Sequence, residues 1–275
     1  MLSAERTDFT TFGPVHLAML VVFGVGCVAL VAVGRRQRAR GNGDWSRGLA
    51  LAIPLFTVPM QVLQFLPGEW DLDTSLPLQI CDVAWVVAAY ALWTHRGWAV
   101  TANWLWGLTL TLQGMLTPDL GSGWGEPRFW MFWGMHWLIV WSAVYLVWGL
   151  GLAPTWRSFR TTVLLTSTWA VAVMVINGWL GTNYGYLNGK PRGASALDLL
   201  GPWPGYVLAE VAIVIAVWAL LTWCWTRRDY RHRVLPSFPS DQGGIRGEQS
   251  SGVVGGRAGS GSGAQRRTGG KQRRR

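Results

Sequence analysis

The chain has 275 residues, of which 50% are hydrophobic, 20 are tryptophan and only 14% are charged. A soluble domain usually carries about a quarter charged residues, so the composition excludes an ordinary soluble protein. A net charge of +10 is typical of nucleic-acid-binding proteins, but the basic residues lie beside apolar runs rather than on a folded face. We therefore expect no nucleic-acid partner.

Seven apolar stretches are long enough to cross a hydrocarbon core of ~30 Å, which takes ~20 helical residues. In chain order they are residues 16–33, 48–66, 75–93, 98–116, 129–150, 161–180 and 204–226. None alternates with a period of two, and backbone groups in lipid must bond internally. The pattern predicts an all-α polytopic membrane protein with seven transmembrane helices.

The basic residues in the connections orient these helices. Twenty Lys and Arg residues fall on the side of the C-terminus and four on the side of the N-terminus. The positive-inside rule then places the N-terminus outside and the C-terminus inside. With 22 Arg against two Lys, and a chain rich in Gly and Ala, we expect a multi-pass protein of a bacterial plasma membrane.

We divide the chain into a seven-helix transmembrane domain, residues 1–235, and a disordered basic cytoplasmic tail, residues 236–275. The tail consists mostly of Gly, Ser, Arg and Gln, which cannot bury enough apolar surface to offset their conformational entropy. It either contacts anionic lipid head groups or is simply solvated. Membrane lipids are the expected partners, and the sequence predicts no oligomeric state.

Polar side chains inside a membrane are costly and often mark function. At 1.5 Å per helical residue, Cys81 and its neighbours lie roughly 6 to 10 Å below the outer boundary, and His136 and Glu210 lie at about the same depth. The layer predicted in the outer half of the bilayer consists of His16, Gln79, Cys81, Asp82, Gln113, His136, Asn177 and Glu210. It resembles the lining of a cavity that opens outward or toward the outer leaflet.

Two interpretations of this layer remain open. A single membrane cysteine is usually a packing residue, and a single histidine is usually a hydrogen-bonded structural residue. At equal depth on neighbouring helices, however, Cys81 and His136 form a plausible nucleophile and base. Asp82 and Glu210 are expected to pair with His136 or to be protonated, because an unpaired buried carboxylate is strongly disfavoured.

The connection between the last two predicted helices is rich in aromatic residues, Pro and Gly. We expect it to form an ordered cap, either a lid over the cavity or an interfacial anchor. The cap residues are Asn183, Tyr184, Tyr186, Lys190 and Trp203. The three cysteines, Cys27, Cys81 and Cys224, each lie in an apolar run, so neither a disulfide framework, a metal site nor a cofactor is expected.

Residues 12–16, the Pro-Leu-Gln-Ile-Cys segment at 77–81, His136 and the connection at 183–204 together resemble the YwaF-like bacterial membrane proteins, relatives of human transmembrane protein 164. The resemblance covers residues 12–225. It implies a cysteine-dependent acyltransferase that moves a fatty acyl chain between phospholipids, with Cys81 as nucleophile and His136 as base.

Two functions therefore remain from the sequence. The first is a membrane acyltransferase that uses Cys81 and His136. The second is a seven-helix small-solute or proton-coupled transporter or receptor, in which the same polar layer binds a solute and no covalent bond forms. A retinal-type photoreceptor is set aside, because neither lysine, Lys190 or Lys271, lies in a predicted span.

The orientation gives a first prediction. A reporter fused after Arg275 is expected to be active in the cytoplasm, and one inserted in residues 185–193 is expected to be active outside, because twenty basic residues oppose four. Paired alkaline phosphatase and green fluorescent protein fusions measure this. An externally active fusion at Arg275 would contradict the seven-span arrangement.

Overall fold

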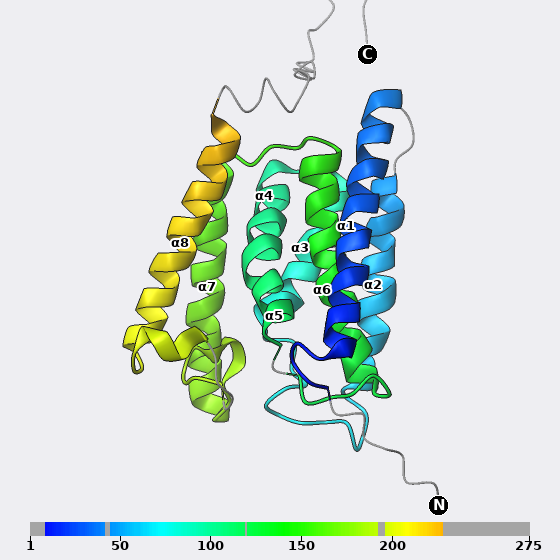
Figure 1. The fold of residues 1–275 in the computed structure, drawn as a ribbon. Coiled ribbons are helices and arrows are strands. Elements are labelled where there is room, and N and C mark those ends of the chain that lie inside the picture. Colours follow the sequence, from blue (N-terminus) through cyan, green and yellow to red (C-terminus); the bar gives the residue numbers. More distant parts are fainter. Residues whose placement is uncertain (1–8, 42–44, 119, 192–195, 228–275) are drawn as a thin grey trace, which may run out of the picture. The chain divides into compact units, whose positions relative to one another are not determined.

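A computed structural model describes residues 9–41, 45–118, 120–191 and 196–227, which form helices and loops with no strand among them (Figure 1). The helices are α1 (Pro14–Arg40), α2 (Trp45–Leu63), α3 (Ile80–Thr94), α4 (Gly97–Trp106), α5 (Leu112–Leu116), α6 (Pro127–Val144), α7 (Trp156–Leu180) and α8 (Gly205–Thr226). Two π-helical turns, η1 (Gly107–Thr111) and η2 (Tyr145–Gly149), join α4 to α5 and extend α6. The predicted tail, residues 236–275, lies outside the described residues.

Five of these segments are long and apolar enough to cross a membrane. They are α1, α2, α6 with η2, α7 and α8. The other two predicted spans correspond to α3 and to the continuous run of α4, η1 and α5. The chain is therefore an all-α, polytopic membrane protein, which confirms the predicted fold class.

The third predicted span begins too early, because α3 starts at Ile80 rather than at residue 75. With 15 residues, α3 is about 22 Å long, shorter than the hydrocarbon core. A proline disfavours helical backbone in the residue before it, so Pro77 keeps Leu76 out of the helix. Gln79 is also extended, with φ of −67° and ψ of 151°, so the segment before Ile80 is a loop, which decides the environment of Cys81.

Two helices extend beyond the spans predicted for them. The first span was expected to end at residue 33, but α1 continues to Arg40, because arginine is a good helix former and the helix can extend into water. Gly41 ends it in the left-handed conformation, with φ of 66° and its N–H bonded to the Gln37 carbonyl. The sixth span begins at Trp156 rather than at residue 161, where the Thr155 hydroxyl caps the helix by accepting the Ser158 N–H.

Helix α6 is central to the packing, since α1, α2, α3, α4 and η1 all contact it. Helix α7 packs against α4 and α8, and α8 packs against α7 and the short turn η4 (Ala196–Leu200). Two tryptophans join α4 and η1 to α7 and α8 through hydrogen bonds. The indole of Trp106 donates to the Thr166 hydroxyl at 2.8 Å, and that of Trp218 donates to the Thr109 hydroxyl at 2.9 Å.

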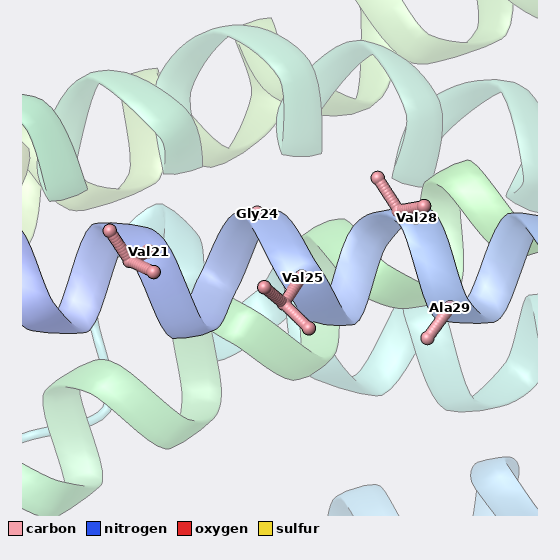
Figure 2. A pocket seen from close by; sticks show the side chains of 5 residues that line it. All are labelled: Val21, Gly24, Val25, Val28 and Ala29. Atoms are coloured by element: carbon pink, nitrogen blue, oxygen red, sulfur yellow. The ribbon is translucent and has the colours of Figure 1, made fainter.

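Helix α1 approaches η2 so closely that the contact requires glycine. A Cβ built on Gly34 would lie 2.7 Å from the Gly149 Cα, and one on Gly149 would lie 3.1 Å from the Gly34 Cα. Small residues let helix backbones pack closely in membranes, where van der Waals contact drives association. On the outer face of the same helix, Gly24 lines a shallow surface hollow with Val21, Val25, Val28 and Ala29 (Figure 2), and a Cβ there would meet nothing within 4 Å.

The two glycines of α1 make a matched pair of variants. Gly34→Ala is expected to lower the free energy of unfolding by about 1–3 kcal/mol, because the new methyl meets backbone that cannot move aside. Gly24→Ala is expected to be neutral or to stabilise by about 0.5–1 kcal/mol, because alanine is the better helix former. Thermal unfolding in detergent measures both, and equal stabilities would contradict the close α1–η2 contact.

Candidate functional site

Cys81 is the second residue of α3, and the start of that helix is fixed by two reciprocal hydrogen bonds. The Gln79 N–H donates to Asp82 Oδ2 at 2.8 Å, and the Asp82 N–H donates to the Gln79 carbonyl at 3.0 Å. The first N–H groups of a helix have no carbonyl partner within it and form its positive end. Cys81 thus lies where a negative charge on sulfur is favoured.

The thiol of Cys81 faces the imidazole of His136, which α6 supplies. The distance from Sγ to Nε2 is 3.3 Å. Both side chains are buried, with 9% of Cys81 and 5% of His136 exposed. The structure therefore brings together the two residues that the sequence suggests as nucleophile and base.

The second hydrogen bond of the ring fixes its tautomer. Nδ1 lies 2.6 Å from the Phe132 carbonyl, which can only accept, so Nδ1 carries the proton. In the neutral imidazole, Nε2 then has a lone pair and accepts from the Cys81 S–H. The Phe132 ring also packs on the imidazole, with centroids 4.2 Å apart. The geometry is that of a thiol whose proton has an acceptor already in position.

Of the two alternatives predicted for Asp82 and Glu210, pairing with His136 is not made, because both ring nitrogens have other partners. Asp82 caps its own helix through the Gln79 N–H, and Phe132 occupies the ring nitrogen at which a carboxylate would act. Glu210 lies on α8, which packs on α7 and η4, and it makes no hydrogen bond or ion pair with another described residue. The Phe132 carbonyl, one helical turn away, already accepts the hydrogen bond of His136 Nδ1.

His16 and Gln113 are also apart from the Cys81–His136 pair. His16 is fully buried, and both of its nitrogens are occupied, since Nδ1 accepts the Phe12 N–H at 2.8 Å and Nε2 donates to the Met115 carbonyl at 2.9 Å. Gln113 is exposed and donates to the Thr117 hydroxyl, just past the end of its own helix. The predicted layer is thus a set of separate hydrogen-bonded contacts around one Cys–His pair.

Asn177 organises the connection between α7 and α8. Its Oδ1 accepts from the Thr182 hydroxyl at 3.0 Å and the Tyr184 N–H at 2.9 Å. Its Nδ2 donates at 2.9 Å to the Tyr184 carbonyl and to Asn188 Oδ1. Asn183 adds bonds to Gly189 and Asn188, closing a short turn, η3 (Tyr184–Tyr186).

The same connection holds the segment that leads into Cys81. The Tyr184 hydroxyl donates to the Leu72 carbonyl at 2.6 Å and accepts the Leu76 N–H at 3.0 Å. Gln79 Oε1 accepts the Gly185 N–H at 3.0 Å. Burial raises the pKa of the Tyr184 phenol, and nearby Asp71 adds to this, so the hydroxyl keeps the proton that it donates.

The remaining cap residues bind within the cap or to α8. The Tyr206 hydroxyl donates to the Tyr186 carbonyl, the Trp203 indole donates to the Leu187 carbonyl at 3.1 Å, and Lys190 pairs with Asp198 at 3.4 Å. In the described parts of the cap, residues 183–191 and 196–204, these side chains are held by hydrogen bonds, and Tyr184 and Gly185 brace residues 72–79. The role of the cap as a lid stays a prediction.

Sequence reasoning missed three residues that contact the Cys81–His136 pair. Phe132 lies four residues before His136, so helical spacing could have identified it. Thr111 and Gly114 approach the pair from η1 and α5, where a Cβ on Gly114 would lie 3.4 Å from His136 Nε2. Their approach depends on the π turn, for which the sequence has no clear signal.

Comparison with known proteins gives one match. A family model described as the TMEM164 family matches residues 11–222. The comparisons with curated proteins and with solved structures found no match. The match confirms the part of the resemblance that concerns transmembrane protein 164, and the narrower YwaF-like grouping stays a prediction.

The role of Asp82 as a helix cap can be tested by stability. Asp82→Ala is expected to lower the free energy of unfolding by about 1 kcal/mol, because the Gln79 N–H loses its partner. Asp82→Asn keeps an oxygen acceptor and is expected to remain near wild type. Glu210→Gln, at a carboxylate with no described partner, serves as the control in the same thermal unfolding assay. An undiminished stability of Asp82→Ala would contradict the cap.

Proposed function

The chain belongs to the TMEM164 family, and from this and the buried Cys81–His136 pair we propose that it is a membrane-embedded, cysteine-dependent acyltransferase acting on phospholipid acyl chains. Cys81 is the nucleophile and His136 is the general base. The protein acts in the plasma membrane of a bacterium, on lipids of the leaflet in which the N-terminal end of α3 lies.

One observation carries the proposal, namely the 3.3 Å contact between the thiol and an imidazole nitrogen whose proton is on the other side of the ring. Burial alone would disfavour a thiolate. A nucleophile of this kind needs a proton acceptor within hydrogen-bond reach, and His136 meets that requirement. The position of Cys81 in the first turn of α3 adds the favourable end of the helix dipole.

The chemistry follows in two balanced half-reactions. The Cys81 thiol gives its proton to His136 Nε2 as sulfur attacks the ester carbonyl carbon of a donor phospholipid. The carbon–sulfur bond forms, the ester carbon–oxygen bond breaks, and the imidazolium returns the proton to the leaving lysophospholipid oxygen. In the second half, His136 takes the proton of an acceptor hydroxyl, whose oxygen attacks the thioester carbon. The new ester carbon–oxygen bond forms, the carbon–sulfur bond breaks, and the imidazolium returns the proton to the Cys81 sulfur.

Kinetics of acyl transfer test the pairing. Cys81→Ala and His136→Ala are each expected to lower transfer by about 10²–10⁴-fold, and the double variant is expected to be little worse, because the two residues act as one unit. Cys27→Ala and Cys224→Ala are the matched controls and should keep wild-type rates. The assay follows a deuterated acyl chain from a phospholipid to a lysophospholipid in vesicles that contain the purified protein.

Two results would overturn the proposal. A Cys81→Ala variant that transfers acyl chains at the wild-type rate would remove the nucleophile. A wild-type protein that transfers no acyl chain from any of the common phospholipid classes, yet moves a solute across the vesicle membrane, would favour the transporter.

A further inference from the structure

Thr111 carries a buried hydroxyl that the proposed pair does not use. The residue ends the π turn η1, its side chain is 1% exposed, and its hydroxyl has no conventional hydrogen-bond partner among the described residues. Buried polar groups are nearly always bonded, so such a hydroxyl calls for an explanation.

The hydroxyl lies beside the site. It is next to the Cys81 thiol, and η1 packs against both α3 and α6, the helices that supply Cys81 and His136. Gly114 follows three residues later and therefore shares a helical face with Thr111. A Cβ on Gly114 would lie 3.4 Å from His136 Nε2, so this face of η1 and α5 forms a wall over the reacting atoms.

The Thr111 hydroxyl forms no hydrogen bond to its own helix. Neighbouring threonines use their hydroxyls on their own helices, as Thr109 donates to the Leu105 carbonyl and Thr166 to the Thr162 carbonyl, each four residues earlier. In η1 the Leu112 N–H reaches back five residues to the Gly107 carbonyl, which widens the turn. Thr111 makes no such backbone bond, and π turns of this kind are frequent at functional sites.

We propose that Thr111 is a further catalytic residue, whose hydroxyl donates a hydrogen bond to the acyl carbonyl oxygen as that oxygen becomes an oxyanion. This inference rests on the proposed acyl transfer. When sulfur attacks, the carbonyl π electrons move to oxygen, and the attacked carbon lies about 3 Å from Sγ. A donor beside Sγ lies within reach of that oxygen.

Gly114 lies in the same wall as Thr111, on the side next to His136. Gly114 packs beside Nε2, where even a methyl would be in van der Waals contact with the ring, so at this position the wall adds no side chain beside the reacting atoms. Thr101 is the control for a buried hydroxyl with a purely structural role. It lies in α4 of the same helical run, is fully buried, and also lacks a hydrogen-bond partner among the described residues.

The experiment compares Thr111→Val, Thr111→Ser and Thr101→Val in the full chain carrying Cys27→Ala and Cys224→Ala. Thr111→Val is expected to lower acyl transfer by about 10²–10³-fold, the loss typical of one oxyanion donor, while Thr111→Ser retains most of the rate. Thr101→Val is expected to match the parent. Cys81 alkylation by iodoacetamide, which forms no oxyanion, is expected to change by less than threefold in Thr111→Val, because the main effect of the lost hydroxyl is on the oxyanion.

The outcomes separate this inference from the proposed function. If Cys81→Ala is inactive but Thr111→Val transfers acyl chains within about threefold of the parent, only the role of Thr111 is overturned. A Thr111→Val loss of acyl transfer that is matched by an equal loss of Cys81 alkylation, or by an equal loss of transfer in Thr101→Val, overturns it as well. If Cys81→Ala keeps the parental rate, the nucleophile assignment is wrong and the role of Thr111 falls with it.

Discussion

An imidazole can take a proton from a neighbouring thiol only through a nitrogen with a free lone pair, and in this protein the bond between His136 Nδ1 and the Phe132 carbonyl determines which nitrogen that is. Because the carbonyl cannot donate, the proton stays on Nδ1 and Nε2 faces Cys81. The donor and acceptor lie on one helix, one turn apart. The tautomer is therefore fixed by α6 itself and needs no buried carboxylate, whose desolvation would be costly.

The position of the thiol depends on a different set of contacts. Pro77 delays the start of α3, and the Gln79–Asp82 bonds set its first turn, so that Cys81 enters at the positive end of the helix. The connection between α7 and α8 holds the preceding segment through Tyr184 and Gln79. A connection more than 100 residues away in sequence thereby fixes where the nucleophile lies relative to its base.

Much of the fold could be predicted, because apolar runs of membrane length have few alternatives to helix. The Cys81–His136 pair was also within reach, since helix depth alone places both residues at one level. The roles of Asp82, Glu210 and His16 were not, because depth says nothing about the direction of a side chain around its helix. Capping by Asp82 and the bonds of His16 to Phe12 and Met115 depend on loop and packing geometry. The wall at Thr111 depends on a π turn that shifts the helical register without a sequence signal.

The measurement that tests the central claim most directly is peptide mass spectrometry of the purified protein after incubation with a phospholipid carrying a deuterated acyl chain. The Cys81–His136 account predicts the labelled acyl group on Cys81 as a thioester, removed by neutral hydroxylamine and absent from Cys27 and Cys224. Label confined to Cys27 or Cys224, or an active wild-type protein with no labelled cysteine at any time during turnover, would contradict it.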